Sequence, residues 1–396
     1  MEGLRVGPRN PWQDGEPVAS LCVLRELGDR ERRVAVVPSE VAKLQALGLS
    51  VVVQSGAGDA AGFPDSAYSA AGTTVAATRA DAIATADLVV MVGPPNVEAV
   101  SDIRIGCALL TLLPPAWSVD VIEVLRDRGV TSFSFNLVPR TSRAQVMDAL
   151  SSQAGVSGYR AAVVVAGRLG RVMPMMMTAA GTVPPARVLV VGTGVAGLQA
   201  IATARRLGAS VSGYDVRPEA AEEIRSLGAV AIELPLMAES GAGGYAAEQT
   251  EEFTVRQQEL LSNAVAASDA VITTAAVPGR PAPQLISASM VEAMRPGSVI
   301  VDLAAPSGGN CELTVEGSDI CFGGVTIVGA GDLASDVATS ASSLYARNVS
   351  NFVKLLVHDG EVSPDIEDEI VVATCVTSAG EVRHEPTRRL MEGAAK

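Results

Sequence analysis

The chain has 396 residues, 48% of them hydrophobic and 19% charged, so it holds enough apolar material for two cores of ordinary size, which excludes a disordered protein. Asp and Glu number 44 against 30 Lys and Arg, and the resulting net charge of −14 disfavours nucleic acid or anionic lipid as a partner. The five cysteines are dispersed and form no CxxC pair, which predicts free thiols in a reducing cytoplasm and no metal site.

The N-terminal part of the chain predicts a leader followed by alternating strands and helices. Residues 1–17 lack the apolar core of a signal peptide and are expected to be disordered, and no later run reaches the roughly eighteen apolar residues of a membrane span. Residues 38–48 and 118–129 show helical spacing, with Pro or Ser at the start and Gly at the end. The alternation is typical of a parallel sheet covered on both faces. The predicted strands are 18–24, 50–56, 87–93 and 107–113.

The stretch RTSRAQVMDALSSQ, which begins at Arg140, concentrates polar groups in a chain that is poor in charge. If a helix begins at Ser142, then Gln145, Asp148 and Ser152 share one face of it. A surface helix start with a serine cap and solvated ion pairs would have the same composition. The stretch by itself therefore leaves a functional and a purely structural interpretation open.

A second series of strands and helices begins with RVLVV, a buried-strand pattern at 187–191 that runs directly into GTGVAG. In such a turn the first glycine permits the tight bend, the second lets backbone approach a pyrophosphate, and the third lets helix and strand pack closely. A helix pattern at 196–208 and a strand at 210–215 ending on Asp215 complete the dinucleotide-binding fingerprint. The candidate cofactor-binding residues of the turn are Gly192, Thr193, Gly194, Val195 and Gly197.

Asp215 bears on which dinucleotide is bound. A carboxylate at this strand end accepts hydrogen bonds from the ribose hydroxyls of NAD and repels the extra phosphate of NADP, which predicts NAD. Arg217, two residues on, could instead receive that phosphate. Strands predicted at 269–275, 298–304 and 325–331 would end along the same crevice, although a strand end can also be buried without any ligand role. The remaining candidate cofactor-binding residues are Val216, Thr273, Thr274 and Ala275, with Asp302 beside them.

The C-terminal part predicts one long helix at 335–360 and a strand-like piece at 369–382 with no helix after it, which is expected to return to the first domain. Two chain crossings would then leave a cleft with the polar stretch at its hinge, facing the nicotinamide end of a cofactor. The predicted fold is α/β, with two Rossmann-like doubly wound parallel-sheet domains and a cleft between them. The expected bounds are 18–150 plus 340–396 for the first domain and 151–339 for the NAD-binding domain.

Five stretches resemble the NAD(H)-binding alpha subunit of proton-translocating NAD(P) transhydrogenase, a relative of alanine dehydrogenase. The resemblance covers the chain from about residue 18 to the C-terminus. It implies that Arg140, Gln145, Asp148 and Ser151 contact the nicotinamide and its carboxamide, and that Tyr245 belongs to a mobile loop that closes over the nucleotide. The stretches are RTSRAQVMDALSSQAGVSGYRAAVVVA (140–166), MPMMMTAAGTVPPARVLVVGTGVAGLQAIATARRLGA (173–209), GAGGYAAEQ (241–249), PGRPAPQLI (278–286) and SLYARN (343–348).

The resemblance also implies an activity and a set of partners. Hydride would pass directly from NADH on this chain to NADP on a partner, coupled to proton translocation by membrane subunits. Such transfer between two nicotinamides releases no proton, so the site needs position rather than a general base. The implied partners are membrane-spanning subunits, including an NADP-binding beta subunit, and a second copy in a homodimer. They would hold the chain on the cytoplasmic side of the inner membrane, and the end at Lys396 is expected for the split form of the enzyme.

Two departures from the family and two other functions stay open. Met91 or Gly93 stands where a lysine is common, and Ala247 stands where the mobile loop often has one. An alanine-dehydrogenase-like enzyme would need an acid/base, usually a His–Lys pair, whereas only His358 and His384 occur, both in the C-terminal part. A non-catalytic NAD-sensing module is the second alternative.

Overall fold

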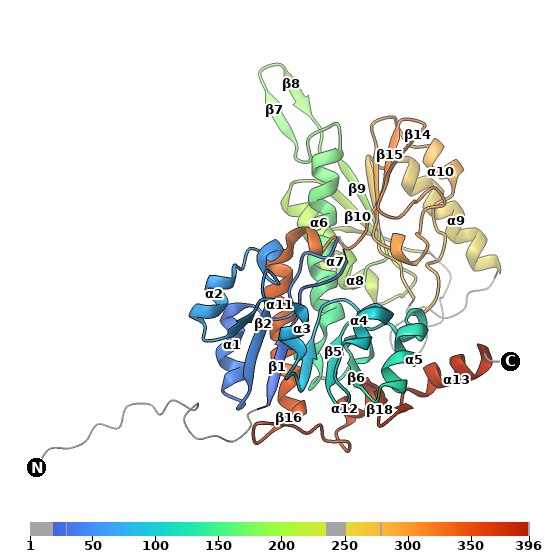
Figure 1. Ribbon diagram of the computed structural model, residues 1–396. Coiled ribbons are helices and arrows are strands. Elements are labelled where there is room, and N and C mark those ends of the chain that lie inside the picture. The colour runs from blue at the N-terminus through green and yellow to red at the C-terminus, as the bar shows by residue number, and fades with distance from the viewer. Residues whose placement is uncertain (1–18, 29, 235–250, 278, 395–396) are drawn as a thin grey trace, which may run out of the picture.

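The computed structural model describes residues 19–28, 30–234, 251–277 and 279–394. Two sheets with helices packed against them occupy separate halves of the molecule (Figure 1). Both sheets are mainly parallel, which confirms the predicted α/β class. The predicted leader lies outside the described residues. Within the described residues, no helix is long and apolar enough to cross a membrane.

The first sheet has the strand order β19-β18-β6-β5-β4-β1-β2-β3. Its strands β1 to β6 are parallel, and the edge pair β18 and β19 is antiparallel. Leu21 and Val23 of β1 face one hydrophobic core, whereas Cys22 and the next residue, Leu24, face the other, so the sheet is buried on both faces. The strands are β1 (Ser20–Val23), β2 (Ser50–Gln54), β3 (Thr74–Ala76), β4 (Leu88–Val90), β5 (Ala108–Thr111), β6 (Thr131–Ser134), β18 (Cys375–Ser378) and β19 (Glu381–Val382).

The helices around this sheet follow the predicted punctuation but are shorter than predicted. Helix α1 has Pro38 in its first turn and ends before Gly48, which has a left-handed φ of 85° that suits glycine. Its buried Val41 and Leu44 pack into the core of the sheet. The helices are α1 (Pro38–Gln45), α2 (Asp65–Ala70), α3 (Arg79–Ile83), α4 (Val97–Ser101) and α5 (Val119–Asp127).

The second sheet has the order β11-β10-β9-β12-β13-β15-β14, with only β14 antiparallel among these strands. Its six parallel strands repeat the order of β3, β2, β1, β4, β5 and β6, which is the order of dinucleotide-binding sheets. Its strands are β9 (Arg187–Val191), β10 (Ser210–Tyr214), β11 (Val230–Ile232), β12 (Ala270–Thr273), β13 (Val299–Asp302), β14 (Asp319–Phe322) and β15 (Val325–Gly329). Its helices are α7 (Val195–Arg206), α8 (Ala220–Ser226), α9 (Glu251–Ala266) and α10 (Ala288–Glu292).

Two long helices, α6 (Ala149–Arg168) and α11 (Ala338–Leu356), connect the two halves. In Figure 1, α6 runs from the first half up into the second, and α11 lies among the helices of the first. Tyr345 and Phe352 of α11 make ring contacts with Phe135 near the first sheet. Gly158 of α6 lies so close to α7 that a Cβ there would be 2.0 Å from the carbonyl oxygen of Ala196. The position of α6 on α7 is therefore fixed by backbone contact.

The C-terminal prediction is correct in place and wrong in structure. Residues 369–374 form a helix, because the side chain of Asp368 caps it by accepting hydrogen bonds from the N–H groups of Ile370 and Val371. A second helix follows the hairpin, whereas none was expected. Strand β18 pairs with β6, so this segment lies on the first sheet. The remaining elements are α12 (Glu369–Thr374), α13 (Glu385–Ala394) and the two hairpins β7 (Met176–Thr178) with β8 (Gly181–Val183) and β16 (Val357–His358) with β17 (Glu361–Val362).

Candidate functional site

The glycine turn between β9 and α7 has the geometry that the sequence predicts. Gly192 has a φ of 85°, and a Cβ on it would lie 2.8 Å from the backbone nitrogen of Ala275. A Cβ on Gly197 would lie 2.0 Å from the carbonyl oxygen of Gly192, so only glycine allows this contact between helix and turn. Gly194 is different, because a Cβ there meets nothing within 4 Å. The open space stands at the N-terminus of α7, whose first N–H groups have no partner within the helix and favour an anion.

Asp215 is held against this turn, just beyond β10. Its carboxylate accepts hydrogen bonds from the backbone N–H of Thr193 at 2.7 Å and from the Thr193 hydroxyl at 3.2 Å. Arg217 donates to the same carboxylate from its backbone N–H at 3.0 Å and from Nε at 3.1 Å. Val216 between them is partly buried against the core of the second sheet, and Val195 is the exposed first residue of α7. Asp215 therefore has two internal partners before any ribose hydroxyl reaches it.

The predicted residues at the end of β12 have different surroundings. The hydroxyl of Thr274 donates to the carbonyl oxygen of Gly192 at 2.8 Å, and the N–H of Ala275 donates to Oδ1 of Asn310 at 2.9 Å. Thr273 is fully buried, and its hydroxyl donates to Asp302 at 2.8 Å. Thr274 and Ala275 thus flank the glycine turn, whereas the side chain of Thr273 points into the protein.

Asp302 and Asn310 form a buried support behind that strand end. The carboxylate of Asp302 also accepts hydrogen bonds from the backbone N–H groups of Asn310 and Cys311, at 2.7 and 3.0 Å. The side-chain amide of Asn310 donates to the carbonyl oxygens of Ala275 and Pro283, at 2.8 and 2.9 Å. These bonds fix the backbone of Ala275 beside the turn. The sequence showed Asp302 as a strand-end acid but gave no signal for Asn310.

The polar stretch has a helix start at a different residue from the one that the sequence favoured. Gln145 is exposed in a 3-10 turn, Gln145–Met147, and helix α6 begins only at Ala149. The physical reason is Asp148, whose carboxylate caps the helix by accepting the backbone N–H of Ser151 at 2.8 Å as well as its hydroxyl. Arg140 is exposed, near the start of this stretch. Asp148 and Ser151 are therefore brought together, with Gln145 in the turn before them.

The packing of α6 on α7 places this stretch near the glycine turn. Gly155 of α6 approaches Val195 at the start of α7, where an added Cβ would lie 3.8 Å from the valine Cγ1. Asp148 precedes Gly155 by about 10 Å along the helix axis, at about 1.5 Å per residue. This spacing is compatible with one ligand that spans the turn and the stretch.

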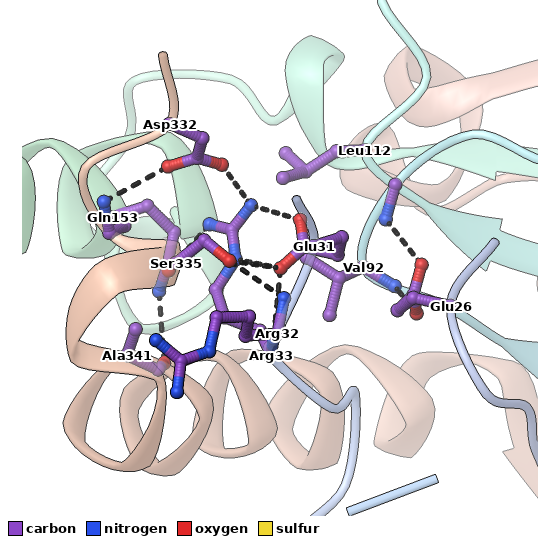
Figure 2. A network of polar contacts seen from close by, with 12 residues as sticks. Glu26, Glu31, Arg32, Arg33, Val92, Leu112, Gln153, Asp332, Ser335 and Ala341 are labelled. Carbon is purple, nitrogen blue, oxygen red and sulfur yellow. Dashed lines mark hydrogen bonds and ion pairs between the residues drawn. The ribbon is translucent and has the colours of Figure 1, made fainter. Parts of the chain in front are cut away.

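A network of buried polar residues closes the wall of the first sheet, and sequence reasoning missed it. Glu26 follows β1, and its carboxylate accepts the N–H groups of Val92 and Gly93 at 2.7 and 3.1 Å (Figure 2). Burial raises the pKa of Glu26 to about 8. The guanidinium of Arg33 is 3% exposed and contacts Glu31, Gln153 and Asp332, from three separate parts of the chain.

The departures noted in the sequence are resolved only in part. Met91 is fully buried in the core of the first sheet, so its side chain does not face the cleft. Gly93 contributes its backbone N–H to Glu26. Tyr245 and Ala247 lie outside the described residues. Within the described part of the chain, no group of three or more His, Cys, Asp and Glu residues could hold a metal ion.

The strand order of both sheets and the glycine turn define a two-domain α/β protein of the dinucleotide-binding class. The chain belongs to the alanine dehydrogenase/PNT family, whose N-terminal domain matches residues 22–157 and whose C-terminal domain matches residues 161–385.

Individual relatives come from both branches of this family. The NAD(P) transhydrogenase alpha subunit of Rhodospirillum rubrum, in the first of its separate pieces, is 45% identical over 92% of this chain and 97% of its own length. Alanine dehydrogenase of Mycobacterium tuberculosis is 33% identical over 72% of each chain. Among solved structures, a transhydrogenase from Sinorhizobium meliloti is 44% identical with a TM-score of 0.84, covering 92% of this chain and 99% of its own. An L-alanine dehydrogenase is 25% identical with a TM-score of 0.78, covering 94% and 99%.

Proposed function

We propose that this chain is the NAD(H)-binding alpha subunit of a proton-translocating NAD(P) transhydrogenase. Hydride would pass directly from NADH in the cleft to NADP on a partner subunit, and membrane subunits would couple the transfer to proton translocation. The higher identity to transhydrogenase alpha subunits than to alanine dehydrogenase supports this branch of the family. The proposed contacts to the nicotinamide end are Arg140, Gln145, Asp148 and Ser151, with Tyr245 on the covering loop.

The observation that carries the proposal is the rigid link between the two candidate contact regions. Helix α6 bears the polar stretch at its N-terminus and packs by backbone contact on α7, which begins at the glycine turn. NADH supplies the hydride from C4 of its nicotinamide when it is bound. The protein then has to hold the ring and its carboxamide in place, which a capped helix start and an exposed amide can do.

An alanine-dehydrogenase-like reaction is the second candidate, and it needs a group that exchanges a proton with the substrate. The sequence has two histidines, and neither is near the polar stretch. His358 lies in strand β16, beyond the C-terminal end of α11, about 15 Å along the chain axis from Asn348, which contacts Val146. His384 precedes α13 and contacts Thr387. This distribution favours transhydrogenation. An NAD-sensing module would show NADH binding without hydride transfer.

We propose NAD rather than NADP as the nucleotide of this chain. Asp215 lies at the strand end where a ribose would reach, and its charge opposes a second phosphate there. Arg217 is engaged with Asp215 through two side-chain nitrogens, which partly neutralises it as a phosphate ligand. The proposed cofactor-binding residues are Gly192, Thr193, Gly194, Val195, Gly197, Asp215, Val216, Arg217, Thr273, Thr274 and Ala275.

The proposed domain bounds are 18–150 plus 340–396 for the first domain and 151–339 for the NAD-binding domain. We also propose a homodimer, held on the cytoplasmic side of the inner membrane by membrane-spanning partners that include an NADP-binding beta subunit. The hairpin β7–β8 supports self-association, because it projects from the second half (Figure 1) and exposes Met175, Met177 and Val183.

The test uses NADH carrying deuterium at C4 and the full chain mixed with an NADP-binding partner fraction. Deuterium should appear in the reduced NADP analogue without exchange into water. Gln145→Asn and Asp148→Asn should slow transfer far more than they weaken NADH binding, because the asparagine at 148 keeps the helix cap while losing the charge. Turnover of pyruvate and ammonia without any partner would instead assign the chain to the dehydrogenase branch.

A further inference from the structure

Arg33 is a buried cation whose partners come from three distant parts of the chain. It stands between β1 and α1 and makes a bidentate contact to Glu31, from Nε at 2.8 Å and from Nη2 at 2.6 Å. Nη1 donates to Oε1 of Gln153 on α6 at 2.9 Å, and Nη2 also pairs with Asp332, which follows β15 of the second sheet. Figure 2 shows the guanidinium at the meeting point of these segments. One side chain thus joins the first sheet, the second sheet and the connecting helix.

Further hydrogen bonds join the same segments. The backbone N–H of Arg32 donates to the hydroxyl of Ser335 at 2.7 Å, and that hydroxyl donates to the carbonyl oxygen of Arg30 at 2.8 Å. The backbone N–H of Val34 donates to the hydroxyl of Ser342 on α11 at 3.0 Å. The loop after β1 is therefore attached to the chain that leaves the second sheet at several points, and among these contacts only the one from Arg33 uses a guanidinium.

The contact to Gln153 leads from this junction to the polar stretch. Nε2 of Gln153 donates to the carbonyl oxygen of Ala341 on α11 at 3.2 Å and to the hydroxyl of Ser152 at 3.1 Å. That hydroxyl in turn donates to Asn348 at 2.8 Å. Gln153 lies within two turns of the N-terminal cap at Asp148. A change in how Arg33 is held would therefore move the first turns of α6, which carry the stretch.

We propose that Arg33 is a positioning residue for hydride transfer. By joining Gln153 to Asp332, it fixes the N-terminal turns of α6 against the second sheet and so sets where the polar stretch stands relative to the glycine turn. The role rests on the proposed function, since it concerns the placement of the nicotinamide bound there. A fork of five donors can satisfy three partners at fixed angles, which a lysine cannot do.

Three substitutions test this role in the full chain. Asp332→Asn keeps the shape of a side chain that is 46% exposed and removes its charge, so the fold should survive. Gln153→Met removes the acceptor on α6, and Arg33→Lys keeps the charge but loses the fork. The matched control is Asp319→Asn, because Asp319 is 39% exposed and pairs with Arg168 of α6 at 2.7 Å, away from the junction. Thermal unfolding confirms that each variant is folded.

The decisive measurement is single-turnover hydride transfer, expressed per NADH-binding site and set beside the NADH dissociation constant. Asp332→Asn and Gln153→Met should each slow transfer about tenfold or more with less than about threefold loss of affinity, since small misplacements are costly in rate. Arg33→Lys should recover part of the rate that Arg33→Met loses, and the control should match the wild type. Unchanged transfer in both first variants, or an affinity loss as large as the rate loss, would overturn the role.

A second measurement separates this inference from the proposed function. The dihydronicotinamide fluorescence of bound NADH depends on how firmly the ring is held, and it needs no partner subunit. Asp332→Asn and Gln153→Met should lower the emission of saturated NADH complexes, whereas Asp319→Asn should not. If the wild type performs no transfer yet the emission falls in this pattern, the proposed function fails and the positioning role stands. Equal emission in all variants refutes the positioning role itself.

Discussion

The raised pKa of Glu26 makes the stability of this protein depend on pH in a direction opposite to that of an ordinary surface carboxylate. Burial is the main cause, and the neighbouring Glu31 adds to it, while the N–H groups of Val92 and Gly93 and the charge of Arg33 act against it. Arg79 and the hydroxyl of Tyr345 are the other titratable groups that sense Glu26. The carboxyl is therefore protonated in the folded protein at neutral pH and ionised in the unfolded chain.

The sign follows from where the proton is bound. Between pH 4.5, the value for an exposed glutamate, and about 8, the folded state holds a proton that the unfolded state has released. Stability therefore falls as pH rises through this window, by up to about 1.4 kcal/mol per pH unit. The full interval corresponds to about 4–5 kcal/mol, and partial contact of Glu26 with solvent reduces the expected loss to roughly 2–4 kcal/mol.

Glu26→Gln should remove this loss, because the amide imitates the protonated acid and never ionises. Chemical denaturation at pH 5.5, 7.0 and 8.5 should show similar stability for the variant and the wild type at the lowest pH. At pH 8.5 the variant should be more stable by roughly 2–4 kcal/mol. Glu361→Gln, at an exposed glutamate, is the control and should follow the wild type throughout. Parallel curves for Glu26→Gln and wild type across the range would refute the reasoning.

Three further predictions concern the cofactor site. Arg217→Ala should sharpen the preference for NADH over NADPH in fluorescence titrations, because it frees carboxylate oxygens of Asp215, while Asp215→Ser should narrow that preference. Gly194→Ala should weaken NADH binding without changing the melting temperature, whereas Gly197→Ala should destabilise the fold itself by about 1–3 kcal/mol through overpacking. Asn310→Ala should cost about 1–3 kcal/mol of stability and weaken NADH binding, because the backbone of Ala275 loses its partners; unchanged binding would contradict its supporting role.

Sequence patterns predicted the second sheet well because its signals are local. A run of buried β-branched residues, a glycine turn and a helix closed by glycine all lie within about twenty residues, and β9 and α7 begin within one residue of the expected places. The start of α6 was harder, since Ser142 and Asp148 are both acceptable caps. Only the hydrogen bonds from Ser151 to Asp148 distinguish them. Helix α12 was missed because EIVVAT is rich in β-branched residues, and its capping Asp368 is held by Arg143 from 225 positions away.

The network around Arg33 could not be predicted for a related reason. Glu31 and Arg33 are visible as a charged pair after the first strand, which is typical of any surface loop. The contact that gives the pair a role is the one to Asp332, 299 positions later in the chain. Nothing local in the sequence indicates that these two segments meet, because their meeting depends on the angle at which two whole sheets pack.

The two sheets share one strand order, but the difference in their first connections separates a binding sheet from a supporting one. In the second sheet, β9 passes to α7 through the glycine turn alone, so the helix N-terminus faces the crevice with open space before it. In the first sheet, β1 ends at Val23 and α1 begins only at Pro38. The loop between them fills the corresponding crevice with protein groups, since Glu26 takes the N–H donors beyond β4 and Arg33 reaches across to the other sheet. The same topology thus provides a nucleotide pocket in one half and, in the other, the attachment that holds the halves in register.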